Sequence, residues 1–334
     1  MPKIPPNPGP KKRAVPQPLR SPAATRLNGW QFHLSRQECQ VLNQLGKRGT
    51  LEQIRNVVAP IVSRVLGLPV ERLTNAVPFC DWVEHLRADN QDLALSVYRL
   101  IDANDPLTQR LVEYLFVGMT SFFRHHAQNA AFQKAFEHLF ETRRSLDNAS
   151  PVRVWVPGCS TGNEAYTIAI LLKDKGYDRL GIPLDVLGTD IVSSNVEKAR
   201  AGRYYYTDDR VDRLMDTGTE ELLDDHREYF YDDASGRNTY VRDDIRAMVR
   251  FEVDNLLYTQ VKGEFDVISC HHVLEHFSQE MRGQAAAFLI SRLRTGGFLV
   301  SNDRIFRQAG GLRQVFEENG YAAYVKTAAE QEKT

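Results

Sequence analysis

The feature that most constrains the fold is a change of hydrophobic pattern at Pro151. After it, short apolar runs rich in β-branched residues alternate with stretches of helical periodicity. Five runs have the character of buried strands: 152–156, 184–187, 248–253, 265–269 and 298–301. Because strands that alternate with helices are joined by crossover connections, such a segment predicts a parallel α/β sheet with helices packed on it.

The part of the chain before this point has a helical pattern. Ser35 and Glu38 have the spacing of a capping box, and a second box begins at Thr50. Pro60 should kink or split the helix that follows this second box. Further helical stretches are expected at about 81–102 and 106–116.

These patterns suggest three parts. Residues 1–28 hold eight of the fifteen prolines and six basic residues without an acidic one, which predicts a disordered tail. A helical N-terminal domain is expected over 29–145 and an α/β domain over 146–334. The stretch at about 201–247 breaks the strand–helix alternation and is too long for a bare loop, so a small antiparallel insertion is expected there.

Composition excludes several classes of protein. Basic and acidic residues nearly cancel, 42 against 43, so no nucleic-acid partner is indicated. No apolar run approaches the roughly 18 residues that a membrane helix needs, so no membrane insertion is expected. The four cysteines are scattered and form no dense framework, which is typical of free thiols in a reducing compartment. We therefore expect a cytoplasmic protein.

Two predicted strand ends carry residues that are suited to binding a ligand. Gly158 and Gly162 form a tight turn between the first strand and a helix, where a ligand can approach the backbone. Asp190 ends the second strand and could accept hydrogen bonds from both hydroxyls of a ribose. A packing turn and a helix cap are the plainer alternatives for these residues. The stricter G-x-G-x-x-G fingerprint of nicotinamide enzymes is absent.

A set of short motifs, in order and spacing, resembles the chemotaxis receptor methyltransferases of the CheR type. The motifs are Thr120-Ser121-Phe122-Phe123-Arg124, the run from Val154 to Ala169, Thr189-Asp190-Ile191, the run from Ala199 to Tyr204, Asp254-Asn255-Leu256 and Phe265-Asp266-Val267-Ile268. Each motif is short, but the ordered set is specific and covers about residues 30–328.

The resemblance implies a fold and a function. It implies a Rossmann-like seven-stranded domain that binds S-adenosylmethionine (SAM), preceded by an all-α domain, and transfer of a methyl group to glutamate side chains of a chemoreceptor-like protein. It also implies that Arg124 faces the methionyl carboxylate of SAM, that Asp190 holds the ribose, and that Asn255 and Leu256 lie against the adenine. Thr120 and Glu164 are expected to contact SAM in the same way. Gly158 of the glycine turn, and His271 and His272 after the fourth predicted strand, are further cofactor-binding candidates.

The chain departs from the family pattern after the fourth predicted strand. His271 and His272 stand where an Arg-Asn pair is usual, and His276 replaces an aromatic residue near the methyl group. Arg124 and His276 are our catalytic candidates. If the acceptor is a hydroxyl compound, His276 or His272 could act as the base, because an imidazole titrates near neutrality. Three further departures are Gly118, Asn163 and Arg304.

Two other functions stay open at this point. One is methylation of a small molecule on oxygen or nitrogen, and the other is a SAM-binding regulatory module that has lost turnover. The run from His272 to His276 also spells the inverted zinc-protease motif, but that motif must lie within one helix. Here it directly follows a predicted strand, so we expect no metal.

Overall fold

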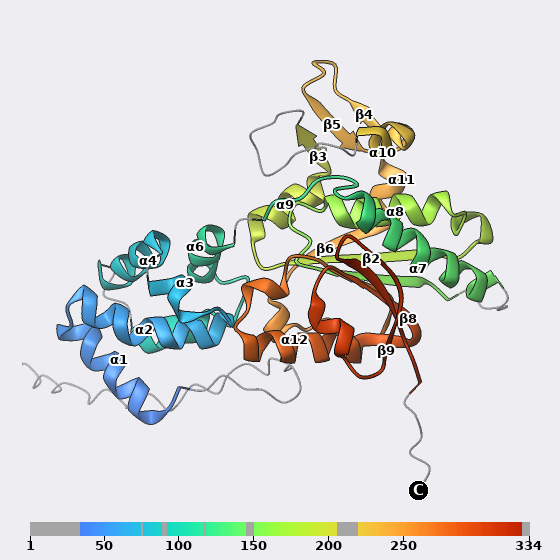
Figure 1. Ribbon diagram of the computed structural model, residues 1–334. Coiled ribbons are helices and arrows are strands. Elements are labelled where there is room, and N and C mark those ends of the chain that lie inside the picture. The colour runs from blue at the N-terminus through green and yellow to red at the C-terminus, as the bar shows by residue number, and fades with distance from the viewer. Residues whose placement is uncertain are drawn as a thin grey trace, which may run out of the picture.

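The computed structural model of the protein describes residues 34–74, 76–88, 92–116, 118–144, 150–205 and 220–328. A group of helices from the first part of the chain lies beside a sheet built from the second part (Figure 1). The tail expected over residues 1–28 lies outside the described residues.

The helical region follows the sequence signals. Its helices are α1 (Arg36–Arg48), α2 (Leu51–Leu66), α3 (Val70–Thr74), α4 (Val77–Ala88), α5 (Leu93–Arg99) and α6 (Pro106–Leu115). Both expected capping boxes are present, at Ser35 and Thr50. Pro60 lies inside α2 and does not split it. The stretch expected over 81–102 contains two helices, and Asp92 caps the second by accepting the Leu95 N–H.

The second region contains a seven-stranded sheet within the described residues, and the α/β prediction is confirmed. Its strands are β1 (Val152–Pro157), β2 (Leu184–Asp190), β6 (Val249–Val253), β7 (Phe265–Cys270), β8 (Leu293–Ser301), β9 (Leu312–Glu318) and β10 (Tyr321–Lys326). Their order is β6-β2-β1-β7-β8-β10-β9. Neighbouring pairs from β6 to β8 are parallel, and β10 is antiparallel to β8 and to β9.

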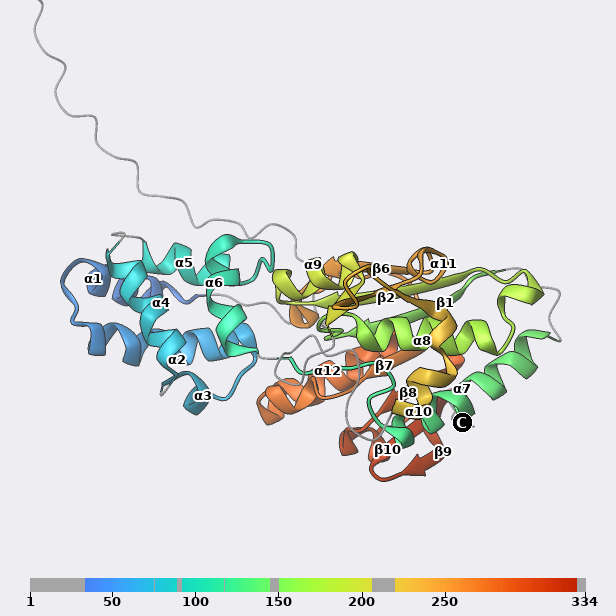
Figure 2. The same cartoon turned by 90° about the horizontal axis from the view of Figure 1, so that it is seen from above.

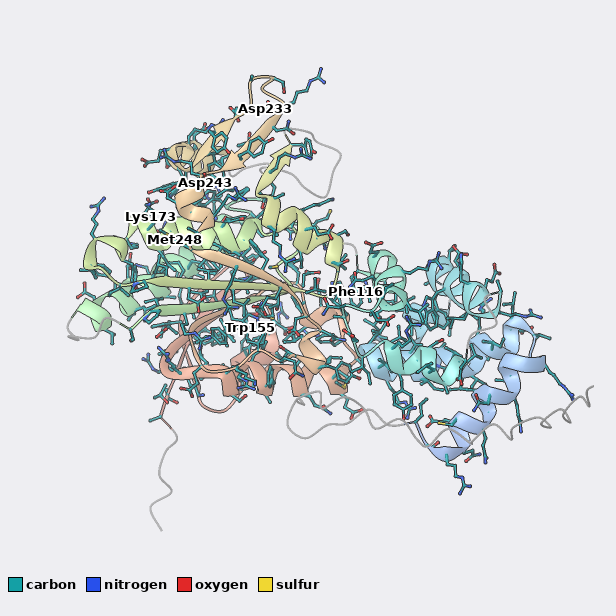
Figure 3. All side chains as sticks on the ribbon, turned by 180° about the vertical axis from the view of Figure 1, so that it is seen from behind. Phe116, Trp155, Lys173, Asp233, Asp243 and Met248 are labelled. Atoms are coloured by element: carbon teal, nitrogen blue, oxygen red, sulfur yellow. The ribbon has the colours of Figure 1, made fainter. Side chains whose placement is uncertain are left out.

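Helices cover both faces of this sheet (Figure 2). They are α7 (His126–Arg144), α8 (Asn163–Asp174), α9 (Ser193–Ala201) and α12 (Gln279–Arg292), with short turns η1 (Asp178–Leu180), η3 (Leu256–Tyr258), η4 (Leu274–His276) and η5 (Arg304–Gln308). Trp155, near the centre of the sheet in Figure 3, packs in one core with α12 and the helical region. Its neighbours Val154 and Val156 belong to the other core, with α7 and α8. Apart from Arg153, β1 reads as an apolar run, as expected of a strand that is buried on both faces, and this made it visible in the sequence.

A small sheet stands apart from the main one. Strands β3 (Arg203–Tyr205), β4 (Phe230–Asp232) and β5 (Asn238–Val241) pair antiparallel in the order β3-β5-β4. It lies above α8 and α9 in Figure 1, accompanied by α10 (Glu220–Asp225), α11 (Asp243–Arg246) and η2 (Arg227–Tyr229). The expectation of an antiparallel insertion is confirmed. The domain boundaries at 28, 145, 201 and 247 remain predictions.

The helices were compared with the length and hydropathy that a membrane-spanning helix needs. Within the described ranges, none of the helices combines the length and the apolar character that crossing a bilayer requires.

Candidate functional site

One cavity of about 250 Å³ lies at the carboxyl ends of the central strands, where the helical region meets the sheet. Phe116, which lines it, lies at this junction in Figure 3. The cavity brings together every site residue named from the sequence. These residues are Thr120, Arg124, Gly158, Glu164, Asp190, Asn255, Leu256, His271, His272 and His276. Their individual roles remain predictions.

The turn after β1 forms the floor of the cavity. Gly158 has a φ of 69° and Gly162 a φ of 89°, both in the left-handed region that favours glycine. A Cβ atom at Gly158 would lie 2.3 Å from Cγ2 of Val273, so no side chain fits. Gly162 then caps α8, whose amino end faces the turn. The glycines therefore allow the chain to turn sharply while its backbone stays close to the cavity.

Asp190 ends β2 and is 9% exposed. Its Oδ2 accepts the Ser160 N–H at 2.8 Å, and its Oδ1 accepts the Val192 N–H at 2.9 Å. Burial raises the pKa of this carboxyl, against these hydrogen bonds and one from Asn195, which lower it. Each carboxylate oxygen keeps a second acceptor position, so the aspartate, held rigidly, can still bind two hydroxyls.

Glu164 and His271 form a buried polar cluster with two residues that the sequence analysis missed. Ser269 Oγ donates to Glu164 Oε1 at 2.6 Å, and Gln128 Nε2 donates to Oε2 at 2.7 Å. His271 Nδ1 lies 3.2 Å from Oε1. Burial raises the pKa of Glu164, but the charge of His271 and these hydrogen bonds outweigh it, and the net shift is downward. Glu164 is thus held ionised, and it orients the His271 ring.

The segment before α7 holds Arg124 at the cavity. Arg124 Nη1 donates to the Met119 carbonyl at 2.8 Å, and Asn129 Nδ2 donates to the Phe123 carbonyl at 2.9 Å. Phe123 is buried with a φ of 50°, so the packed structure fixes a backbone that is rare for this residue. Arg124 is therefore presented from an ordered loop.

Another part of the cavity wall is formed by the residues after β6. Asn255 Oδ1 accepts the Leu257 N–H at 3.0 Å and so caps η3. Its amide Nδ2 is buried without a protein partner. Burial raises the pKa of Asp254 to about 6, against hydrogen bonds from Thr259 and Gln260. A planar ligand against Leu256 would meet a free amide donor and a carboxyl at this wall.

His272 and His276 belong to the departing segment after β7. His272 has a φ of 55°, its N–H donates to Asn302 Oδ1 at 3.2 Å, and its Nε2 lies 3.4 Å from the Tyr321 hydroxyl. His276 ends the short turn η4, and its Nδ1 lies 2.7 Å from Nη1 of Arg72 in the helical region. The motif from His272 to His276 therefore does not lie within one helix, as a zinc-protease site requires.

Buried polar atoms without protein partners mark where a ligand would bind. Besides Asn255 Nδ2, they include Ser160 Oγ, Asp254 Oδ2 and His271 Nε2, all on residues that line the cavity. Since an unmet buried polar group costs about 1–3 kcal/mol, this set favours a ligand with several donors and acceptors.

The remaining departures from the family pattern, Gly118, Asn163 and Arg304, differ in how they relate to the cavity. A Cβ at Gly118 would lie 2.7 Å from Ser160 Oγ, so a larger residue there would displace that serine. Asn163 is buried and accepts a hydrogen bond from Thr161 Oγ1 at 2.8 Å. Arg304 is exposed and does not line the cavity.

Comparison with known proteins gives one family. The model described as "CheR methyltransferase, SAM binding domain" matches residues 118–319. The "Chemotaxis protein methyltransferase" of Vibrio parahaemolyticus serotype O3:K6 is 31% identical over 157 residues, which are 46% of this chain and 54% of that protein. The protein of the same description from Listeria monocytogenes serovar 1/2a is 27% identical over 229 residues, which are 66% of this chain and 77% of that protein. The chain thus spans about half the length of the first of these relatives.

Solved structures give a weaker likeness. Magnesium protoporphyrin IX methyltransferase (ChlM) from Synechocystis PCC 6803 with bound SAM is 15% identical with a TM-score of 0.30, covering 60% of this chain and 80% of that one. The N-methyltransferase NodS from Bradyrhizobium japonicum WM9 with S-adenosyl-L-homocysteine is 12% identical with a TM-score of 0.31, covering 60% and 100%. Likeness at this level does not identify an acceptor.

Proposed function

The chain belongs to the CheR methyltransferase family, whose SAM-binding domain it contains, and from this premise we propose that it methylates glutamate side chains of a chemoreceptor-like protein. The observation that carries the proposal is that one cavity gathers Arg124, Asp190 and Asn255 from three distant parts of the chain. We propose that the reaction takes place in the cytoplasm.

The residues of the cavity fit SAM as the cofactor. The unpartnered Asn255 amide and the apolar Leu256 suit an adenine, whose edge offers hydrogen-bond acceptors and a donor. Asp190, which is fixed by two backbone N–H groups, suits the ribose hydroxyls. Arg124 suits the methionyl carboxylate, because a guanidinium fork matches a carboxylate.

The proposed methyl transfer needs no general base from the protein. When bound, SAM supplies a methyl group that passes to a lone pair of the acceptor carboxylate oxygen, while the electrons of its carbon–sulfur bond stay on sulfur as a neutral thioether. A glutamate has an ordinary pKa of about 4.3, so its carboxylate is already the nucleophile and no base is required. The residues of the cavity must align the acceptor and exclude water, and the junction of two regions with Phe116 at its edge suits this task.

Small-molecule methylation and a regulatory module remain the alternatives. The experiment that separates them incubates the purified protein with methyl-labelled SAM and cell extract. We expect label on a protein, released as methanol by mild alkali, as methyl esters are. Label in a small metabolite would instead support the first alternative, and SAM binding without any transfer would support the second. The variant Asp190→Ala is the negative control for each arm, because it removes the ribose partner.

A further inference from the structure

Arg72 and His276 form a contact across the junction of the two regions that the proposed reaction does not explain. The Arg72 Nη1 atom lies 2.7 Å from His276 Nδ1, although 204 positions separate the two residues in the sequence. A guanidinium carries only donors and stays protonated in proteins. The Nδ1 atom must therefore be the acceptor, which makes the imidazole neutral with its hydrogen on Nε2.

The guanidinium is itself held firmly. Its Nη2 donates to the Leu115 carbonyl at 2.9 Å, and its Cζ lies 5.7 Å from the centre of the Phe116 ring. The His276 ring meets the same phenyl ring edge-on, with centroids 5.9 Å apart. Arg72 is therefore fixed by backbone and ring contacts at the edge of the cavity that Phe116 and His276 line.

The backbone on either side of this contact is tightly packed as well. The Ser278 N–H donates to the Gly67 carbonyl at 2.7 Å, joining the end of α2 to the start of α12. A Cβ at Gly67, whose φ is 68°, would lie 2.7 Å from Cδ1 of Leu257. The two sides are thus locked close to the Arg72–His276 pair.

The surroundings of His276 favour the same neutral state on balance. Burial lowers the pKa of His276, and the charge of Arg72 on α3 lowers it further, as does His272. Glu275, the neighbour in the chain, raises it but does not reverse the net shift. The hydrogen bond and its surroundings both favour the neutral ring.

We propose that Arg72 is a positioning residue that fixes His276 as a neutral Nε2–H donor toward the methyl acceptor. This inference rests on the proposed function and specifies the acceptor. Because Nδ1 is already engaged, His276 has no free lone pair with which to remove a proton. His276 therefore suits an acceptor oxygen that arrives without a proton, namely a carboxylate, and cannot serve as the base that a hydroxyl compound would need. His271 has the opposite arrangement, since its Nδ1 faces the Glu164 carboxylate.

The first test reads the tautomer directly. Full-length protein labelled with ¹⁵N-histidine is examined by long-range proton–nitrogen NMR, and the His276 signals are identified by their loss in His276→Gln. We expect a bare Nδ1 and a protonated Nε2 throughout neutral pH. In Arg72→Met this preference should disappear, and the pKa of His276 should rise. A protonated Nδ1 in the wild type, or unchanged signals in a folded Arg72→Met, would overturn the proposal.

The second test does not depend on Arg72→Met folding. A glutamine at 276 can accept from Arg72 through its carbonyl and donate through its amide, but it cannot act as a base. We expect His276→Gln to keep most of the turnover on a glutamate acceptor and His276→Leu to lose about 10- to 100-fold. Equal losses in both variants, or full turnover in His276→Leu, would refute a donor role.

The acceptor that is methylated and the tautomer of His276 together distinguish failure of this inference from failure of the proposed function. If the wild type methylates only a small hydroxyl compound, both fall. If glutamate is methylated but His276 carries its proton on Nδ1, the inference alone is wrong. Calorimetry with SAM is the control, because Arg72 does not line the cavity and its replacement should leave the affinity within about twofold.

Discussion

Replacement of Asp190 by alanine tests the placement of the cofactor most directly. The carboxylate is fixed by N–H groups of Ser160 and Val192, and each oxygen has one acceptor position left for a ribose hydroxyl. Loss of these charge-assisted bonds should cost about 1–3 kcal/mol of binding free energy. At about 1.4 kcal/mol for each tenfold, the dissociation constant for SAM should rise about 5- to 150-fold.

Isothermal calorimetry with SAM and with S-adenosylhomocysteine measures this change. Asp185→Ala is the matched control, because Asp185 lies on the same strand, does not line the cavity, and pairs instead with Arg153 and Arg250 at 3.3 and 3.0 Å. We expect the control to bind SAM like the wild type. Circular dichroism must show that Asp190→Ala is folded, since it also leaves two buried N–H groups unpaired. An affinity within twofold of the wild type in a folded Asp190→Ala would refute the assignment of the ribose site.

Three further predictions concern stability. Gly158→Ala should lower the free energy of unfolding by about 1–3 kcal/mol, because its backbone has a φ of 69° and the new Cβ would lie 2.3 Å from a methyl carbon of Val273. Gly283→Ala, which adds a Cβ in open space on α12, should raise the free energy of unfolding slightly. Urea titration of the two variants compares them. Asp254→Asn should be more stable than the wild type by about 1–3 kcal/mol at pH 8 and equally stable at pH 3. Because the pKa of Asp254 is raised to about 6 in the folded protein, ionisation of this carboxyl opposes folding once the pH exceeds the ordinary pKa of an aspartate. A stability advantage that stays constant with pH would contradict this reasoning. Glu164→Gln should be less stable than the wild type by about 1–3 kcal/mol at pH 7, and this difference in unfolding free energy should vanish as the pH falls through the lowered pKa of Glu164. Thermal unfolding measured across pH checks this. A difference that persists in acid would exclude the ionised cluster with His271.

The half of the site that faces the cofactor could be predicted because its signals are local. Gly158 follows β1, Asp190 ends β2 and Asn255 comes shortly after β6, and carboxyl ends of parallel strands meet at one edge of a sheet. A motif at the end of each strand therefore implies a shared pocket before any contact is known. Neither β9 nor β10 was predicted as a strand; most positions along β9 are exposed or half-buried, which weakens its apolar pattern.

The contacts made by Arg72 and Gln128 could not be predicted in the same way. Arg72 sits in a short helix without a motif, and only the packing of the helical region against the sheet brings it to His276. Gln128 lies on a long helix whose polar residues resemble those of any solvated face, and its role depends on the approach of α7 to Glu164. Such contacts depend on tertiary packing, which hydrophobic periodicity does not encode.

The histidines that replace the expected family residues bear on whether turnover has been lost. The His271 ring is paired with Glu164 on α8 and the His276 ring with Arg72 on α3, while the backbone N–H of His272 donates to Asn302 after β8. The partners also hold the rings in distinct states, since one Nδ1 faces a carboxylate and another accepts from a guanidinium. We propose that this arrangement serves an acceptor site and not a regulatory module, and the pair of variants at 276 tests this chemistry as well as the packing.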